Sequence, residues 1–173
     1  GEGAAAINAA LANASFGIDL EQFALARNLT SASMETLLER VRQQSPPPLA
    51  VPIEGSRLPR LIGASAAEAL SKRLTDLLRH FHTEQPSEAG LLESAIARAL
   101  KPSIPRPVLK GLITVQTAAG LLRSVRGAHG GLQLGRPAAA ITVADIVEAI
   151  EGWLLAAEPE GSVPDGRVLQ VAG

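Results

Sequence analysis

Positive side chains are concentrated in one short segment of this 173-residue chain. Residues 101–136 contain no Asp or Glu, although the whole chain has 16 basic and 17 acidic residues and a net charge of −1. The basic residues of the segment are Lys101, Arg106, Lys110, Arg123, Arg126 and Arg136. Arginine suits phosphate because its planar guanidinium donates two hydrogen bonds at once. A polyanion is therefore the partner that this charge distribution predicts.

The spacing of these residues predicts how they would reach a phosphate backbone. Arg106 and Lys110 are four residues apart in a predicted helix, so they share one of its faces. Arg123 and Arg126 precede the glycine-rich turn 127–131, whose glycines let the backbone approach a polyanion without Cβ clashes. Phosphate contacts position a protein on nucleic acid but read no sequence. The predicted nucleic-acid-binding residues are Arg106, Lys110, Arg123, Arg126, His129 and Arg136, and the alternative for each is ordinary surface charge.

Residues suited to catalysis or metal binding are scarce. The chain has no Cys, which excludes disulfides, thiolate metal sites, iron–sulfur ligation and a Cys nucleophile. His80 and His82 are two residues apart on a predicted helix and lie on nearly opposite sides of it, so they cannot share a metal. No phosphate-binding loop or nucleophile elbow is present, and Glu148 and Glu151 are better explained as solvated helix charges than as a catalytic pair. We therefore expect no enzyme activity, no cofactor and no metal.

The elements that would position the basic residues follow a repeated pattern. Apolar residues at helical spacing predict three helices in the first part of the chain. The second of these is capped by Asp19, and the third begins at Thr30 or Ser31. Two short extended runs follow at 49–53 and 56–62, and their prolines predict that both are edge strands.

A second set of three helices and a hairpin follows. The S-x-x-E sequence that begins at Ser65 predicts a capped helix start, and another helix is expected directly after Pro86. A third helix is predicted from about residue 105 to 118, before the hairpin that holds the glycine-rich turn. Thr142 and Asp145 then predict the cap of a final amphipathic helix, with Trp153 and Leu154 on its apolar face.

This order predicts a mainly α fold with small β-hairpins (α+β), organised as tandem winged-helix domains. The expected divisions are a first winged helix at 1–63, a second at 64–137, a C-terminal amphipathic helix at 138–158 and a flexible tail at 159–173. No stretch approaches the roughly 18 apolar residues of a membrane span, and no signal sequence opens the chain, so we expect a cytoplasmic protein without a membrane partner. Because the first residue is Gly1 rather than Met, we expect a piece of a longer protein.

Three segments resemble the C-terminal winged helices of SelB, the selenocysteine-specific elongation factor. They are Gly17-Ile-Asp-Leu-Glu-Gln-Phe-Ala-Leu-Ala-Arg-Asn-Leu29, Leu78-Arg-His-Phe-His-Thr-Glu-Gln-Pro86, and the stretch from Ile104-Pro-Arg-Pro-Val-Leu109 to Gly120-Leu-Leu-Arg123. The resemblance implies RNA binding to a hairpin of selenoprotein mRNA during translation elongation. The GTPase portion would be absent from this chain, which has no G-x-x-x-x-G-K-[ST] sequence. On this resemblance an RNA hairpin is the preferred partner.

A second resemblance is to transcription regulators of the IscR and NsrR type. It is carried by Gly120-Leu-Leu-Arg-Ser-Val-Arg-Gly-Ala-His-Gly-Gly-Leu-Gln-Leu-Gly-Arg-Pro137 and by Ile141-Thr-Val-Ala-Asp-Ile-Val-Glu-Ala-Ile-Glu-Gly152. Those regulators usually hold an iron–sulfur cluster through Cys residues, so this resemblance implies a cluster-free relative that binds duplex DNA. A protein-interaction scaffold is the third alternative, because fold alone does not decide function.

Overall fold

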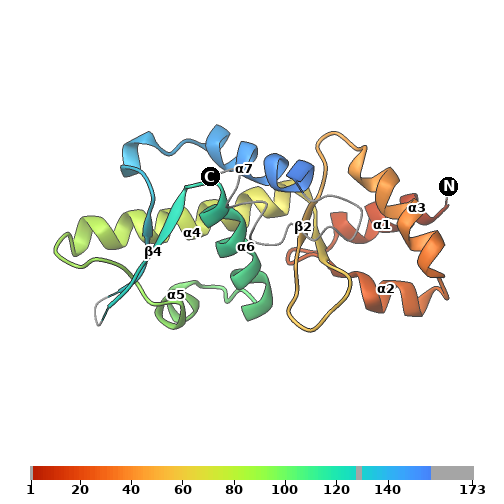
Figure 1. The fold of residues 1–173 in the computed structure, drawn as a ribbon, viewed down its shortest axis with the longest axis horizontal. Coiled ribbons are helices and arrows are strands. Elements are labelled where there is room, and N and C mark those ends of the chain that lie inside the picture. The colour runs from red at the N-terminus through yellow and green to blue at the C-terminus, as the bar shows by residue number, and fades with distance from the viewer. Residues whose placement is uncertain (1, 128–129, 157–173) are drawn as a thin grey trace.

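The computed structural model describes residues 2–127 and 130–156, where helices dominate and the strands are short. The first set of elements is α1 (Glu2–Ala12), β1 (Ile18–Asp19), α2 (Leu20–Ala26), α3 (Ser31–Arg42), β2 (Leu49–Val51) and β3 (Arg60–Ile62). The second set is α4 (Ala64–Glu84), α5 (Glu93–Ala99), α6 (Arg106–Ala118), β4 (Leu122–Val125), β5 (Gly131–Leu134), the 3-10 helix η1 (Ala138–Ala140) and α7 (Val143–Ala156). Helices α1, α2 and α3 lie at one end of the molecule and β4 towards the other, with β2 between them (Figure 1). The predicted α+β fold class is confirmed.

The starts of α2 and α3 are the predicted ones. Asp19 Oδ1 accepts hydrogen bonds from the backbone N–H groups of Glu21 at 2.9 Å and Gln22 at 3.1 Å. Thr30 Oγ1 accepts one from the N–H of Ser33 at 3.1 Å. These oxygens satisfy first-turn N–H groups that have no partner within the helix. Both caps are confirmed.

The sheet of the first set is antiparallel and has the strand order β1-β3-β2. β3 is therefore the central strand, and the prediction that prolines confine both extended runs to sheet edges is wrong for it. Pro59 precedes Arg60, the first residue of β3, so the missing N–H of the proline leaves the ladder intact. β1 carries no sequence signal, because a strand of two residues shows no alternation.

Two expectations for the second set are also wrong. The N-cap of α4 is Gly63, which has no side chain to accept a hydrogen bond, so the sequence at Ser65 does not cap this helix. The segment after Pro86 is not helical until α5 begins. Leu91 instead exchanges two backbone hydrogen bonds of 2.8 Å with Leu132 of β5. This bridge supplies the strand before α5 and gives the second set the same α-β-α-α-β-β order as the first.

Helix α7 begins with the predicted cap. The backbone N–H of Thr142 donates to Asp145 Oδ2 at 2.8 Å, and the N–H of Asp145 donates to Thr142 Oγ1 at 3.2 Å. Ile146 and Ile150 are buried on its inner face, whereas Val143 is exposed. Among the described side chains, Ile146 and Ile150 therefore lie on the expected buried stripe, and Val143 does not.

Two predictions at the end of the chain lie outside the described residues. They concern the side chains of Trp153 and Leu154 and the tail at 159–173. Within residues 2–127 and 130–156, no helix combines the length and the apolar character needed to cross a bilayer.

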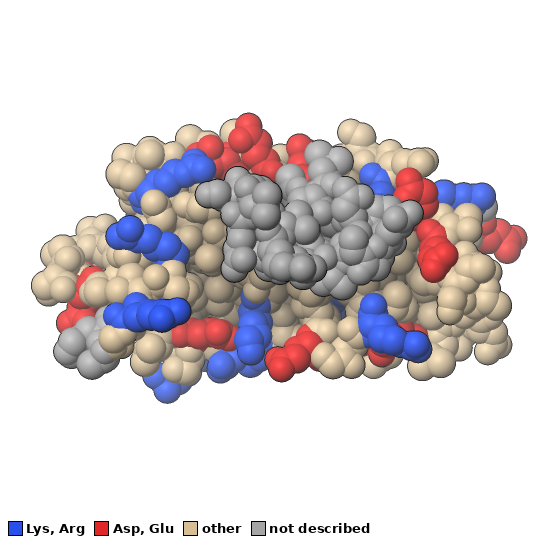
Figure 2. Space-filling view, in the orientation of Figure 1, with Lys and Arg blue, Asp and Glu red and all other residues tan. Residues whose placement is uncertain are grey.

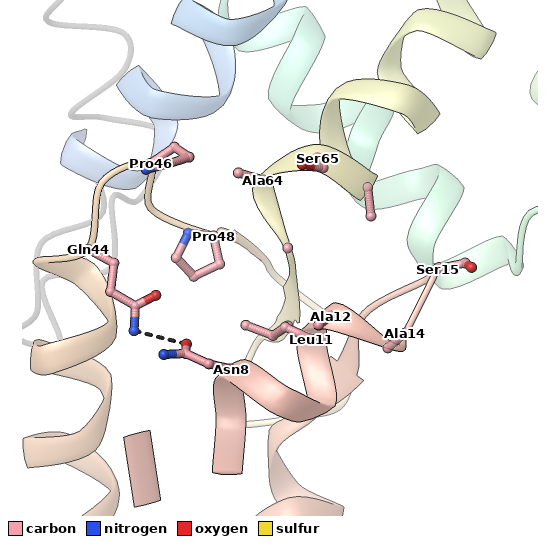
Figure 3. A pocket seen from close by; sticks show the side chains of 12 residues that line it. Asn8, Leu11, Ala12, Ala14, Ser15, Gln44, Pro46, Pro48, Ala64 and Ser65 are labelled. Atoms are coloured by element: carbon pink, nitrogen blue, oxygen red, sulfur yellow. Dashed lines mark hydrogen bonds between the residues drawn. The ribbon is translucent and has the colours of Figure 1, made fainter. Parts of the chain in front are cut away.

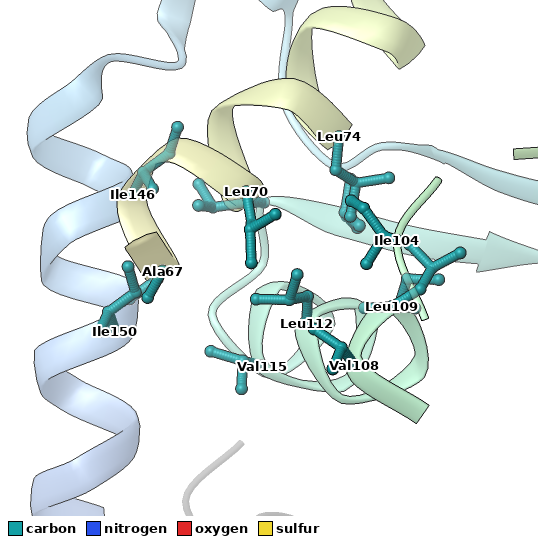
Figure 4. Packing of buried hydrophobic residues seen from close by; sticks show 14 of the residues in the cluster. Ala67, Leu70, Leu74, Ile104, Val108, Leu109, Leu112, Val115, Ile146 and Ile150 are labelled. Carbon is teal, nitrogen blue, oxygen red and sulfur yellow. The ribbon is translucent and has the colours of Figure 1, made fainter. Parts of the chain in front are cut away.

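Buried apolar side chains form two clusters. The smaller one joins α1, α2 and α3 with Leu61 of β3. The larger one joins α4, α5, α6, α7 and the hairpin β4–β5, and Figure 4 shows part of it. Leu49, Val51 and Ile62 of the hairpin β2–β3 belong to the larger cluster, because alternate residues of a strand face opposite sides. The hairpin β2–β3 thus contributes to both clusters, and the predicted boundary after residue 63, like the other divisions, stays a prediction.

Candidate nucleic-acid interface

Helices α5 and α6 form a helix-turn-helix whose second helix has two distinct faces. Val108, Leu109 and Leu112 are fully buried and fix α6 on the larger cluster. Arg106 and Lys110 are exposed on the opposite side. The 3.6-residue period of the helix separates the two groups, since residues four apart lie above one another. The inner face is therefore an anchor, and the outer face presents cations.

The hairpin β4–β5 carries the next two predicted residues. Arg123 and Arg126 are both exposed. Arg123 lies opposite Gln133 in the ladder. With its amide turned to suit its neighbours, Gln133 accepts a hydrogen bond from Arg123 Nη2 at 2.8 Å and donates one to the carbonyl of Ala89 at 3.0 Å. Arg126 has no hydrogen bond or ion pair to another described residue.

The cations of α6 face carboxylates from other elements. Arg106 Nη2 lies 4.0 Å from Glu93 Oε1 of α5, and Lys110 Nζ lies 3.7 Å from Glu54 Oε2 in the loop between β2 and β3. Exposed pairs of this kind contribute about 0–1 kcal/mol each, because water screens them and long side chains lose freedom. A phosphate group can therefore displace either carboxylate.

The remaining two predicted residues are Arg136, which lies beside an acidic residue of α7, and His129. Arg136 Nη1 lies 3.5 Å from Asp145 Oδ1 at the start of α7. The hydrogen bond from the backbone of Thr142 is the main reason that the pKa of Asp145 is lowered, and Arg136 adds a smaller contribution. That carboxylate stays charged, so Arg136 keeps an acidic partner. His129 lies outside the described residues.

Two further cations extend this surface. Arg98 at the end of α5 and Lys101 in the turn before α6 are both exposed. Lys101 was counted in the basic segment but not among the predicted binding residues, and Arg98 was missed. Figure 2 shows Lys and Arg side chains spread over the part of the molecule that holds α5, α6 and β4, with a few acidic groups among them. Arg98 precedes the acid-free segment, so only the helix-turn-helix boundaries could have identified it.

A separate cleft of about 540 Å³ lies between α1, the segment after α3 and the start of α4 (Figure 3). Gln44 Nε2 donates to Asn8 Oδ1 across it at 2.9 Å. None of the lining residues is Asp, Glu, His, Lys or Arg, so the cleft offers no acid or base for catalysis. In the described part of the chain, no three His, Cys, Asp or Glu side chains are grouped as a metal site.

Comparison with known proteins relates the chain to transcription regulators. Residues 72–167 match the model of the Rrf2 family, described as iron-dependent transcriptional regulators. The HTH-type regulator YwgB of Bacillus subtilis, described as putative, is 39% identical over 67 residues, which are 39% of this chain and 42% of YwgB. IscR of Cereibacter sphaeroides is 46% identical over 48 residues, which are 28% of this chain and 31% of IscR. CymR of Bacillus subtilis is 46% identical over 44 residues, 25% of this chain and 32% of CymR.

The chain thus spans less than half the length of each of these relatives. A solved structure of CymR, titled as the global cysteine regulator of B. subtilis, has 27% sequence identity and a TM-score of 0.42. The likeness covers 61% of this chain and 78% of that one.

These matches overturn one of the two resemblances. The interpretation as a SelB-type elongation factor is wrong, because the matching family and relatives are transcription regulators. The residues that suggested it include buried helix residues such as Leu20 and Leu109, which a winged helix needs for packing whatever it binds. The resemblance of residues 120–152 to IscR-type regulators is confirmed. Since the Rrf2 model matches more than half of the residues, this chain belongs to the Rrf2 family of transcriptional regulators.

Proposed function

We propose that this chain is the DNA-binding part of a transcription regulator and grips duplex DNA with α6 and the hairpin β4–β5. The observation that carries the proposal is the exposed cationic face of α6, with Arg106 and Lys110, together with Arg123 and Arg126 on the hairpin. The major groove of B-DNA is wide enough to admit an α-helix. Helix-turn-helix proteins place their second helix there. The names of YwgB, IscR and CymR as HTH-type transcriptional regulators support the same role.

The proposed contacts divide into two kinds. Thr114, on the outer face of α6, would face base edges in the major groove. Arg106 and Lys110 of the same helix would contact phosphates. Arg123 and Arg126 would contact phosphates beside the groove and so fix the orientation of α6. The buried face of α6 would keep the helix rigid as it enters, since Leu109 and Leu112 are anchored in the larger cluster.

The iron named in the family description does not fit the residues of this chain. Iron–sulfur clusters are held by Cys thiolates, and the 173 residues include no Cys. The described residues also contain no group of three His, Asp or Glu side chains placed to hold a metal. The described residues of this chain therefore do not support an iron-dependent role. A DNA ligand also agrees with the predicted cytoplasmic location.

A titration by fluorescence anisotropy tests the proposal. The full chain is titrated into a short labelled duplex of mixed sequence and, in parallel, into a labelled hairpin RNA, each at two salt concentrations. We expect tighter binding to the duplex. Arg123→Ala with Arg126→Ala should weaken it and reduce the slope of log K against log salt by about 0.9 for each lost phosphate contact. Arg40→Ala, which removes an exposed arginine of α3, is the matched control and should change neither value.

Two results would contradict the proposal. One is tighter binding to the hairpin RNA than to the duplex. The other is an unchanged affinity and salt dependence after both hairpin arginines are removed. Absence of binding to either nucleic acid at low salt would favour the third alternative, a protein-interaction module.

A further inference from the structure

The loop between β2 and β3 forms one wall of a groove whose other wall is the outer face of α6. The groove has a volume of about 680 Å³. Pro52, Ile53 and Glu54 line it from the loop, Glu93 lines it from α5, and Arg106, Pro107, Lys110, Gly111 and Thr114 line it from α6. The surface proposed to meet DNA is therefore bordered by a segment that lies outside the family match at 72–167.

This loop is held in position by the core beneath it. Val51, three residues before Glu54, is completely buried in the larger cluster together with Leu49. A Cβ atom on Gly111 would lie only 1.8 Å from Val51 Cγ1, so β2 packs directly on the backbone of α6. The N–H of Ser56 donates to the carbonyl of Ile53 at 3.1 Å and closes the turn. Glu54 therefore stays beside α6 as long as the core is intact.

The acidic groups of the groove are placed where phosphates would bind. The Glu54 side chain is 90% exposed and its carboxylate lies 3.7 Å from Lys110 Nζ. Glu93 of α5 lies 4.0 Å from Arg106, which is one helical turn from Lys110 on α6. A phosphate that approaches either cation must come close to a carboxylate of the same charge sign, and like charges at short range repel. The carboxylates thus compete with phosphate for the same two cations.

We infer that Glu54 and Glu93 weaken the sequence-independent binding of this chain to duplex DNA by competing with its phosphates for Lys110 and Arg106. The inference rests on the proposed function and concerns the regulation of that same site. Phosphate contacts supply affinity without sequence information. Reducing them leaves a larger share of the binding energy to base contacts, which helps a regulator to ignore the many non-specific sites around it.

The test measures the affinity of the full chain for a duplex of mixed sequence at low salt. Glu54→Gln keeps the size of the side chain and removes its charge, and we expect affinity to rise about two- to fivefold, the range of an exposed ion pair. The gain should shrink as salt is added, because ions screen exposed charges. In a Lys110→Ala background the same substitution should change affinity by less than about twofold. Glu35→Gln, which removes an exposed carboxylate of α3, is the control for net charge.

Different results would overturn the inference about Glu54 and the proposed DNA binding. If Glu54→Gln binds no tighter than Glu35→Gln, or gains equally with and without Lys110, the inference is overturned while DNA binding by α6 stands. If the unmodified chain binds no duplex and Lys110→Ala changes nothing, the proposed function fails and the inference falls with it. Urea denaturation of each variant establishes that these surface substitutions leave the fold unchanged.

Discussion

Gly111 of α6 and Val51 of β2 are packed so closely that no side chain fits at position 111. A Cβ atom there would lie 1.8 Å from Val51 Cγ1 and 3.0 Å from Val51 Cβ. Real Cβ atoms do not approach other carbons so closely, so any larger residue would push β2 away from α6. The hairpin β2–β3 precedes the part of the chain that matches the Rrf2 family, yet it is built into the same core.

Gly111→Ala should therefore destabilise the protein. Inserting a methyl group into a well-packed core costs about 1–3 kcal/mol in the free energy of unfolding. Gly63→Ala is the comparison, because a Cβ there would make ordinary contacts of 3.6 and 3.8 Å with Leu11 and the expected cost is limited to the N-cap preference for glycine over alanine. Adding Val51→Ala to Gly111→Ala should recover part of the loss by making room. Equal stability of the Gly111 and Gly63 variants in urea denaturation would show that the two elements do not pack in this way.

Burial in the larger cluster predicts that substitutions of Leu112 and Leu25 differ in their effect on stability. Leu112 is completely buried on the inner face of α6, so Leu112→Ala should cost about 2–5 kcal/mol through lost burial and the cavity left behind. Leu25 on α2 is 78% exposed, and Leu25→Ala should change stability by about 0.5 kcal/mol or less. Chemical denaturation measures both values. Similar costs for the two substitutions would mean that α6 is not anchored as described.

His82 predicts a pH dependence of stability. Its Nε2 accepts a hydrogen bond from the backbone N–H of Leu134 in β5 at 3.3 Å, and partial burial lowers the pKa of the imidazole below its usual 6.5. The imidazole of His82 is therefore protonated less readily in the folded protein than in the unfolded chain. The contribution of neutral His82 to the free energy of unfolding is complete above the pKa that His82 has in the unfolded chain. It is lost as the pH falls through the lower pKa that His82 has in the folded protein.

Urea denaturation over a pH series from about 7.5 to 5 measures this effect. His82→Gln should flatten the fall in unfolding free energy, since glutamine does not titrate. His80→Gln, which changes the exposed histidine of the same helix, is the control for the substitution itself. If the unfolding free energy of the His82→Gln variant fell with pH as steeply as that of the unmodified chain, His82 would not be the source of the pH dependence.

The six predicted interface residues should not contribute equally to DNA binding. Arg126 has no partner among the described residues, whereas Arg136 lies 3.5 Å from Asp145. Arg126→Ala should therefore lose more affinity for a duplex than Arg136→Ala, and it should lower the salt slope by about 0.9. Anisotropy titrations at several salt concentrations give both numbers. A larger loss for Arg136→Ala would place the DNA nearer to α7 than to the hairpin.

Local signals in the sequence predicted much of the fold. Asp19, Thr30 and the pair Thr142 and Asp145 identified three helix starts, because a cap depends only on residues within one turn. The same reasoning failed at Ser65, where a polar residue near a helix start is not the cap. It also failed at Leu91, whose apolar character suits a helix and a β-bridge equally well.

The sequence also predicted only part of the candidate interface. The charge count identified Arg106 and Lys110, since their spacing fixes them on one helix face. Their acidic neighbours could not be predicted, because Glu54 reaches Lys110 only through the packing of β2 on Gly111. The partner class was also misjudged. Buried residues such as Leu20 and Leu109 are needed for packing whatever the partner is, and such residues were part of the resemblance to an elongation factor.

In the proposed function, α6 and the hairpin β4–β5 together form the surface that binds duplex DNA. An NMR titration of the isotopically labelled full chain with a short duplex of mixed sequence tests it most directly, because each backbone amide reports its own environment. We expect the largest chemical-shift changes on residues 106–118 and 122–134, with few changes on α1, α2 and α3. Changes concentrated on α2 and α3, or no changes at low salt, would contradict it.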